Sequence, residues 1–371
     1  MIGYVAAPAP PVVLVPGPNQ ASFGAISGRV GRRAVRVVVR VDGRLRGMQT
    51  PRSGRFSFHV RLPPRDVSIR VTAVDARGHG ASTTVRPVLG LPASAAPRYV
   101  LSVRDGKLMN LIGRLARRFP GTSAVYVEDL TSGRGAAWNA RARFPAASTL
   151  KLAIAVAVLR TVRAPPHPGT SVAELMRAML IYSDNQSANE LADLAGGGYA
   201  IDGMLRALGI SDTEMDGSYV VEPRDKRAPP IPVGTVSQPY LSPGKYTTAW
   251  DLARLIRYVE LAAAGKGLLA KRFPSFSPSC ARYLLYELAH VQDPGKLSRF
   301  LPGNVRVAHK AGWHSIVRHD NGLVFWSRGS FVATVMTWNP SGVGTASDVL
   351  AGRVAWLALR RFARLARRDS H

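Results

Sequence analysis

Hydrophobic and polar residues alternate along the N-terminal part of the chain. The alternation is clearest over residues 56–62 (Phe-Ser-Phe-His-Val-Arg-Leu) and recurs over 67–73. Over 35–41 the valines at odd positions form one apolar row, opposite Arg36 and Arg40. A period of two predicts strands with one buried and one solvent-facing side. Turn-forming pairs separate these runs at Asp42-Gly43, Ser53-Gly54, Pro63-Pro64 and Arg77-Gly78. Several short strands at this spacing predict a small all-β sandwich.

The pattern changes after residues 91–98, a small, proline-punctuated segment that predicts a linker. Residues 106–118 carry apolar positions at helical spacing, with Asp105 placed as an N-cap. Beyond them the periodicity predicts strands near 123–130 and 135–144, helices near 148–162, 171–182, 185–195 and from 248, strands near 304–311, 316–327 and 330–338, and a final helix at 347–367. This order of elements indicates an α+β domain.

The sequence therefore predicts four segments: a leader or disordered stretch at 1–11, the β-sandwich at 12–90, the linker at 91–98 and the α+β domain at 99–371. Residues 1–16 are apolar, but prolines interrupt them and no basic residue precedes them, so they do not match a signal peptide. A second interpretation is that they are the tail of one that begins upstream.

Composition narrows the class of protein. Hydrophobic residues make up 46% of the 371 residues, which is enough for a sizeable core. No apolar run reaches the ~18–20 residues of a membrane-spanning helix. The single cysteine, Cys280, excludes an intramolecular disulfide and a cysteine-rich metal site, and we expect it to be a buried residue within a helix.

The chain carries 50 basic and 23 acidic residues, a net charge of +27, yet only eight of the basic residues are lysines. Residues 1–98 hold 15 arginines, no lysine, three aspartates and no glutamate. Such a field favours anionic partners, among them nucleic acid, acidic polymers and membrane surfaces. The alternative is a solvated, arginine-rich surface without a partner.

Three short motifs occur in the second part of the chain: Ser148-Thr-Leu-Lys151, Ser183-Asp-Asn185 and Lys310-Ala-Gly312. Ser148 opens an apolar helical run, so Lys151, three residues later, lies on the same face and can reach the serine hydroxyl. A serine hydroxyl needs a nearby base to act as a nucleophile, and a lysine with a lowered pKa can supply it. Lys310 is a candidate for the second cation that lowers this pKa. The free N–H groups at the helix start can stabilise an oxyanion.

In this order and context, S-x-x-K, S-D-N and K-x-G resemble the signature of class A β-lactamases and penicillin-binding proteins. The resemblance extends over about residues 106–368, and it implies an antiparallel sheet flanked by helices. It further implies that Ser148 is the acylated nucleophile, Lys151 its general base and Ser183 a proton relay. Asn185 would position the lysine or the substrate's amide side chain, and Lys310 would attract the substrate carboxylate. The backbone N–H groups of Ser148 and Trp313 would form the oxyanion hole, and Gly312 and Trp313 would belong to the substrate-binding residues. The N-terminal β-sandwich resembles bacterial immunoglobulin-like modules.

Two positions depart from the family pattern. Ala311 stands where the family has threonine or serine, so a hydroxyl that helps to hold the substrate carboxylate is missing. The second departure concerns the sequence around the glutamate that activates the deacylating water in class A enzymes. Residues 210–246 form a long stretch with little periodicity, and Glu222-Pro223 is its best match to that glutamate, with Glu214 a weaker candidate. A surface ion-pairing role for Glu222 is the competing interpretation.

Other chemistry is not expected. His309, His314 and His319 lie close in sequence but lack carboxylate or cysteine companions, so no metal and no cofactor is predicted. The arginine-rich last helix has an apolar face that we expect to pack on the sheet, with a membrane-surface helix as the alternative.

The resemblance implies a serine hydrolase that forms an acyl-enzyme, with β-lactam hydrolysis as the leading reaction. A peptidoglycan D-Ala-D-Ala peptidase is the enzymatic alternative, and a non-catalytic cell-wall-binding protein on the same scaffold is the other. The expected partners are a β-lactam or a peptidoglycan peptide and an anionic cell-wall polymer, rather than nucleic acid. We expect a monomer that acts outside the cytoplasm.

Overall fold

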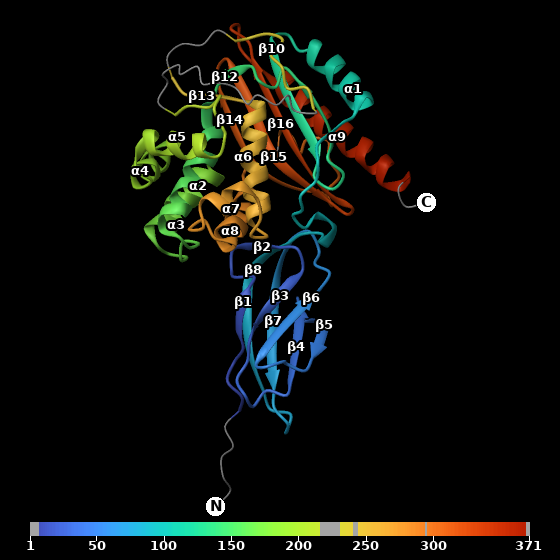
Figure 1. Ribbon diagram of the computed structural model, residues 1–371, viewed down its shortest axis with the longest axis vertical. Helices are drawn as coiled ribbons and strands as arrows, with labels where there is room; N and C mark the ends of the chain where they lie inside the picture. Colours follow the sequence, from blue (N-terminus) through green and yellow to red (C-terminus); the bar gives the residue numbers. More distant parts are fainter. Residues whose placement is uncertain (1–6, 216–230, 240–243, 294, 369–371) are drawn as a thin grey trace, which may run out of the picture. The chain divides into compact units, whose positions relative to one another are not determined.

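The computed structural model describes residues 7–215, 231–239, 244–293 and 295–368 (Figure 1). The chain forms two compact units, Met1–Ala96 and Pro97–His371. Their junction falls next to a short 3₁₀ turn, η1 (Ala93–Ala95), within the predicted linker. No helix of the described residues is long and apolar enough to cross a membrane.

The N-terminal unit consists of two sheets that face each other. The strands of the first sheet are, in spatial order, β1 (Val12–Val15), β3 (Ala25–Arg29) and β6 (Arg55–His59). Those of the second are β2 (Gln20–Ser22), β8 (Gly80–Gly90), β7 (Asp66–Val74), β4 (Arg36–Val41) and β5 (Arg44–Gln49). Inward residues of both sheets form one core, among them Ile26, Val37, Val39, Phe56, Ile69 and Val71. The predicted all-β sandwich is confirmed.

One detail of the predicted strand at 35–41 is wrong. Val37, Val39 and Val41 are buried, as the alternation predicts, but Val35 is 47% exposed. Strand β4 begins only at Arg36, so Val35 lies outside the buried part of the sheet.

A six-stranded sheet forms the centre of the C-terminal unit. Its strands are, in spatial order, β14 (Arg306–His314), β15 (Val317–Trp326), β16 (Gly329–Trp338), β10 (Thr122–Asp129), β11 (Arg134–Trp138) and β9 (Val103–Arg104). All neighbours are antiparallel except β11 and β9. Two further strands, β12 (Arg143–Pro145) and β13 (Tyr246–Thr248), pair with each other beside this sheet. The predicted strand at 135–144 is therefore two strands, β11 and β12, in different sheets.

Helices cover both faces of the central sheet (Figure 1). On one face α1 (Gly106–Arg117) and α9 (Thr345–Arg368) share a core with the strands, to which α9 contributes Val354, Ala358 and Phe362. The apolar face of the last helix thus packs on the sheet, as expected. The opposite face is covered by α6 (Ala249–Ala262). The other helices are α2 (Lys151–Val162), α3 (Ser171–Ile181), α4 (Asn185–Leu194), α5 (Gly197–Ala207), α7 (Gly267–Arg272) and α8 (Pro278–Leu288).

The N-cap predicted at Asp105 and the buried helical position predicted for Cys280 are both confirmed. The Asp105 carboxylate accepts a hydrogen bond from the Leu108 N–H at 3.0 Å and so caps α1. Cys280 is buried in α8. The predicted helix at 148–162 is divided: residues 147–150 form a 3₁₀ turn, η2, and α2 begins at Lys151.

Candidate active site

The Ser148 hydroxyl lies on the turn η2 (Ala147–Leu150), at the entrance to a buried helix. Ala147 has a φ of 47°, a left-handed conformation that an alanine rarely adopts, so the chain bends sharply just before the serine. From this turn α2 runs into the interior, and Lys151, its first residue, is 6% exposed. The two residues of the first motif therefore lie at the boundary between solvent and core.

The second motif lies in the connection between α3 and α4. Ser183 has a φ of 61°, and the Asp184 carboxylate caps α4 by accepting the Ser187 N–H at 2.7 Å. The Lys151 ammonium donates to the Ser183 carbonyl, to the Asn185 Oδ1 at 2.7 Å and to the Ser183 Oγ at 3.3 Å. The left-handed turn thus directs both oxygens of Ser183 at the lysine, and Asp184 has a structural role as the cap of α4.

The third motif approaches from the edge strand β14. The Lys310 Nζ donates to the Ser183 Oγ at 3.0 Å and to the Ala311 carbonyl at 3.0 Å. The hydroxyl of Ser183 therefore lies between the amines of Lys151 and Lys310. Since each amine can donate, one serine hydroxyl connects the first and third motifs.

Gly312 allows β14 to touch the turn that carries Ser148. A Cβ at this position would lie 2.7 Å from the Ser148 nitrogen and 2.8 Å from the Thr149 nitrogen, closer than Cβ atoms come to other atoms. A glycine is therefore required for the strand to approach the backbone N–H groups of η2. The next residue, Trp313, has a side chain that is 63% exposed.

Burial makes both amines weaker bases than an ordinary lysine. It lowers the pKa of Lys151 to about 8, against the opposing effect of the Asp184 carboxylate. Burial, and next the positive charge of Lys151, lower the pKa of Lys310 to about 7, although Asp320 and Asp293 act in the other direction. Lys310 was expected to lie near Lys151 as a second cation; in the structure the two amines meet at Ser183, and burial is the largest cause of the lowered pKa of each.

The motif residues line two hollows that share Trp313. One, of about 280 Å³, is lined by residues that include Ser148, Lys151 and Asn185. The other, of about 410 Å³, is lined by residues that include Ser183, Lys310 and Ala311. The structure thus brings together the residues of all three motifs that the sequence singled out.

Arg318 also lines the second hollow, and the sequence analysis did not identify it. It is the Cα partner of Trp313 across β14 and β15, its guanidinium lies 5.8 Å from the indole centre, and its Nε donates to Asp348 at 2.6 Å. The sequence could have identified Arg318, because two strands joined by a short turn after His314 place it directly opposite Trp313.

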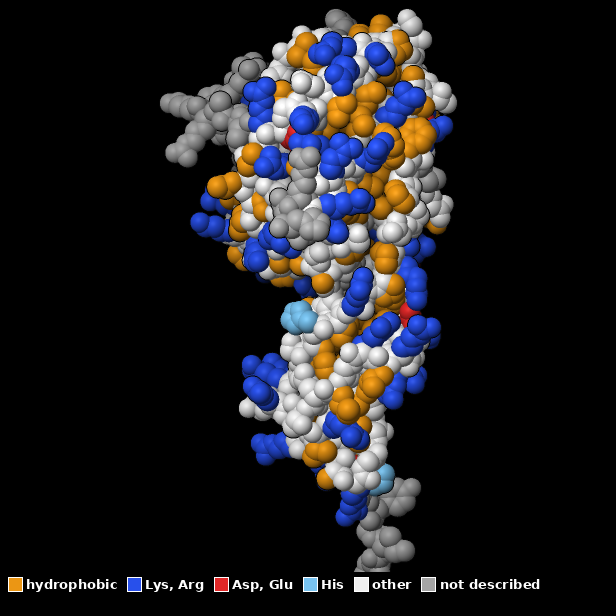
Figure 2. Space-filling view, turned by 90° about the vertical axis from the view of Figure 1, so that its right-hand side faces the viewer, with side chains coloured by type: hydrophobic (Ala, Val, Ile, Leu, Met, Phe, Trp, Pro, Cys, Tyr) orange, Lys and Arg blue, Asp and Glu red, His pale blue; other side chains and the backbone are white. Residues whose placement is uncertain are grey.

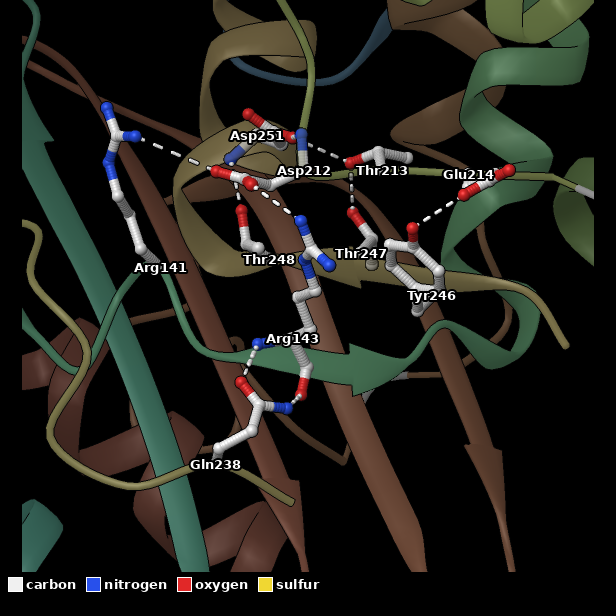
Figure 3. A network of polar contacts seen from close by, with 10 residues as sticks. All are labelled: Arg141, Arg143, Asp212, Thr213, Glu214, Gln238, Tyr246, Thr247, Thr248 and Asp251. Carbon is white, nitrogen blue, oxygen red and sulfur yellow. Dashed lines mark hydrogen bonds and ion pairs between the residues drawn. The ribbon is translucent and has the colours of Figure 1, made fainter. Parts of the chain in front are cut away.

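The two glutamate candidates have different outcomes. Glu222 lies outside the described residues. Glu214 is buried, and its Oε2 accepts the Tyr246 hydroxyl at 2.5 Å (Figure 3). No acidic residue is among the described residues that line the hollow beside Ser148.

A network of polar contacts fixes the segment that leads to Met215, another residue of that hollow (Figure 3). The Asp212 carboxylate pairs with Arg143 at 3.2 Å and Arg141 at 3.7 Å. Buried Asp251 accepts the Asp212 N–H and the Thr213 hydroxyl, both at 2.9 Å. Burial and the neighbouring Asp212 raise the pKa of Asp251 to about 6. Both α6 and β12 therefore hold this segment in place.

Two of the three histidines near the third motif have separate structural partners. His309 Nδ1 lies 2.8 Å from the Asp320 carboxylate, and His319 Nε2 lies 2.8 Å from the Pro145 carbonyl. Among the residues described, no group of three or more His, Cys, Asp or Glu side chains is arranged to hold a metal ion.

Two curated beta-lactamases are similar to part of this chain in sequence. It is 30% identical to a beta-lactamase of Streptomyces fradiae over 173 residues, 39% of this chain and 55% of that protein. It is also 30% identical to the carbapenem-hydrolyzing beta-lactamase KPC of Klebsiella oxytoca over 138 residues, 29% of this chain and 47% of that protein. The chain thus spans about half the length of the curated relatives it matches.

Solved structures share the fold. PBP-A superposes with a TM-score of 0.57 at 23% identity, over 71% of this chain and 98% of PBP-A. The beta-lactamase from Sphaerobacter thermophilus gives 0.53 at 22% identity, over 69% of this chain and 97% of its own. A β-lactamase-like fold, a sheet between layers of helices, is therefore confirmed.

The family model described as "Beta-lactamase enzyme family" matches residues 107–167 and 163–362. These stretches include all three motifs and cover more than half of the chain. The chain belongs to the beta-lactamase enzyme family.

Proposed function

We propose that this chain is a serine hydrolase that opens β-lactam rings through an acyl-enzyme on Ser148. The observation that carries the proposal is the Ser183 hydroxyl, held between the amines of Lys151 and Lys310 beside the Ser148 turn. Two lysines with lowered pKa around one hydroxyl provide both a base and a route for protons.

The first step is attack of the Ser148 Oγ on the lactam carbonyl carbon. Neutral Lys151 takes the hydroxyl proton, and the carbonyl oxygen becomes an oxyanion that the backbone N–H groups of Ser148 and Trp313 stabilise. Collapse breaks the C–N bond, and the Ser183 hydroxyl passes a proton to the leaving nitrogen. Lys151, which is hydrogen-bonded to Ser183, then returns a proton to the Ser183 hydroxyl.

Substrate binding falls to the residues around the two hollows. Lys310, when charged, attracts the carboxylate of the substrate, and Asn185 hydrogen-bonds its amide side chain. Gly312 lets β14 approach the backbone of the Ser148 turn, so that the edge strand and the nucleophile border the same site. The roles of Lys310 and Asn185 are supported by the place of each residue in the lining of a hollow. The hydrogen bond from Lys151 to the Asn185 Oδ1 supports a further role of Asn185 in positioning the lysine.

Hydrolysis of the acyl-enzyme needs a water and a base. We propose Glu222 for this base on the basis of its place in the sequence alone. The side chain of Glu214 is already bound to Tyr246, which argues against it as the base.

The alternative function is a D-Ala-D-Ala peptidase that reacts with penicillins but hydrolyses the acyl-enzyme slowly. The lack of an acidic residue among the described residues that line the hollow beside Ser148 favours it. One structural neighbour, a mutant of PBP-A, is an acyl-enzyme complex with penicillin G. Both functions place the protein outside the cytoplasm, where these substrates are met.

Two probes separate the candidates. A chromogenic cephalosporin reports turnover, and a fluorescent penicillin reports a stable covalent adduct, with Ser148→Ala as the control for both. Turnover supports the hydrolase, whereas labelling without turnover supports the peptidase. If Ser148 is labelled by neither compound, the chain is a non-catalytic member that keeps the scaffold for binding.

A further inference from the structure

A row of three arginines crosses the sheet β1-β3-β6 of the N-terminal unit. Arg29 on β3 and Arg55 on β6 are Cα partners in antiparallel strands. Arg52 and Arg55 form a bridge on either side of the Ser53-Gly54 turn. Directly opposed residues project from the same side of a sheet, with their Cβ atoms ~5 Å apart. The three exposed arginine side chains therefore leave the sheet on the same, solvent-facing side.

This row has no acidic partner in the described part of the chain. Of the three aspartates in residues 1–98, Asp42 pairs with Arg65 at 2.7 Å, Asp75 lies 3.2 Å from His79, and Asp66 lies on β7 in the other sheet. The side chains of Arg29, Arg52 and Arg55 make no ion pair or hydrogen bond with a described residue. Like charges directly opposite one another are unfavourable, so an anion bound between them would stabilise the sheet.

The row lies in a long hollow rather than on a flat surface. One part, of about 970 Å³, is lined by Arg29, Arg52 and Arg55 together with Ser27, Ser57 and other residues. The adjoining part, of about 700 Å³, has the same Arg29 and Arg55 in its lining and adds Arg32. Because the two parts share their arginines, the hollow suits a chain of anionic groups better than a single ion. Basic side chains greatly outnumber acidic ones on the face of the molecule in Figure 2.

The chemistry of the hollow restricts the kind of polyanion. Phe56 is in the lining of the hollow but is only 3% exposed. None of the exposed large apolar residues described in this unit is aromatic, so an exposed ring to stack on a nucleobase is lacking among them: Val12, Leu14, Val35, Leu45 and Met48. The cations are arginines, whose planar fork binds the oxygens of phosphate in pairs. The Cβ atoms of neighbouring arginines in the row are ~5 Å apart, so these long side chains can reach successive anions of a flexible chain. A carboxylated polysaccharide places a sugar ring between its charges and fits less well.

We propose that the hollow around Arg29, Arg52 and Arg55 binds a phosphodiester-linked polyol. This interaction is independent of the chemistry at Ser148. It would hold the enzyme on a surface rich in such polymers, whichever reaction the C-terminal unit performs.

The test uses the full chain and fluorescein-labelled poly(glycerol phosphate), titrated by fluorescence anisotropy at 50, 150 and 300 mM NaCl. The groove variant is Arg29→Gln with Arg55→Gln. The control variant is Arg40→Gln with Arg70→Gln. Arg40 and Arg70 are also a directly opposed arginine pair, but they lie on β4 and β7 of the other sheet and do not line the hollow.

We expect the groove variant to bind at least tenfold more weakly at 150 mM NaCl, with a salt slope reduced by about two, whereas the control variant changes less than threefold. An equal loss in both variants would show that net charge alone attracts the polymer, and lack of binding by the unmodified chain at 150 mM NaCl would also overturn the proposal. Equal or tighter binding of single-stranded DNA or of poly-glutamate would refute the assigned chemistry. If the double variant does not fold, as judged by thermal melting, the single variant Arg29→Gln is titrated in the same assay. Weaker binding than that of the control variant then supports the proposal, and an equal affinity overturns it.

Discussion

Replacement of Lys151 by arginine separates the charge of this residue from its ability to accept a proton. Lys151 is 6% exposed, and burial lowers the pKa of its amine to about 8. At pH 7 about one molecule in ten therefore carries a neutral lysine, against about one in three thousand for a lysine of pKa 10.5. Burial thus increases the reactive fraction about 300-fold. An arginine, which stays protonated in proteins, removes this fraction altogether.

We expect Lys151→Arg to slow acylation by about 10²–10⁴-fold at pH 7, the usual contribution of a general base. In the unmodified enzyme, acylation also requires Lys310 in its charged form, and burial and Lys151 lower the pKa of Lys310 to about 7. The second-order rate constant should then rise with pH as Lys151 loses its proton and fall as Lys310 does. A bell centred near pH ~7.5, midway between the two pKa values, is expected.

The assay is single-turnover labelling by a fluorescent penicillin from pH 5.5 to 9.5 at constant ionic strength. Lys271→Arg, a change of the same kind at an exposed position on α7, is the control. A variant Lys151→Arg that is labelled at the normal rate would refute lysine as the base. A profile that rises steadily to pH 9.5 would refute the lowered pKa of Lys310.

Three further outcomes are expected. Ser183→Ala removes the hydroxyl between the two amines and should slow acylation at least ~10²-fold with little change in thermal stability; a normal labelling rate would contradict its role as relay. Ala311→Thr adds a hydroxyl in the hollow beside Lys310, and one hydrogen bond to a carboxylate, ~1.5–3 kcal/mol, should lower the KM for penicillins about 10–100-fold; an unchanged KM would mean that the carboxylate binds elsewhere. Burial lowers the pKa of His319 to about 4, and its Nδ1 accepts the Thr337 N–H at 3.2 Å. Because the unfolded chain takes up this proton near pH 6.5 and the folded chain does not, stability is full above pH ~6.5 and falls by up to ~3 kcal/mol towards pH 4. Urea unfolding of His319→Gln should lose this part of the pH dependence, and an identical dependence in both proteins would refute it.

The fold could be predicted largely from local patterns. Alternation over 56–62 and 67–73 located strands β6 and β7, and helical spacing after Asp105 located α1. Errors arose where tertiary contacts overrule a local pattern. Continuous apolar periodicity gave no sign that the run 135–144 changes sheet between β11 and β12, because the change depends on the pairing of β12 with β13, about a hundred residues later.

The sequence by itself determined the family, through three motifs in a fixed order, and it identified two of only eight lysines as the amines of the site. Those inferences need only residue identity and short-range spacing. It did not determine that Lys151 and Lys310 meet at a single hydroxyl, nor that burial brings their pKa values to about 8 and 7. It likewise showed that residues 1–98 are rich in arginine, but not which of these arginines lie together.

Only the tertiary structure brought Arg29, Arg52 and Arg55 into one row and left them without acidic partners among the described residues. The meeting of the two lysines and the row of arginines escaped the sequence for the same physical reason. Desolvation and charge–charge interaction depend on distances between residues far apart in the chain, and strand register and helix packing set those distances.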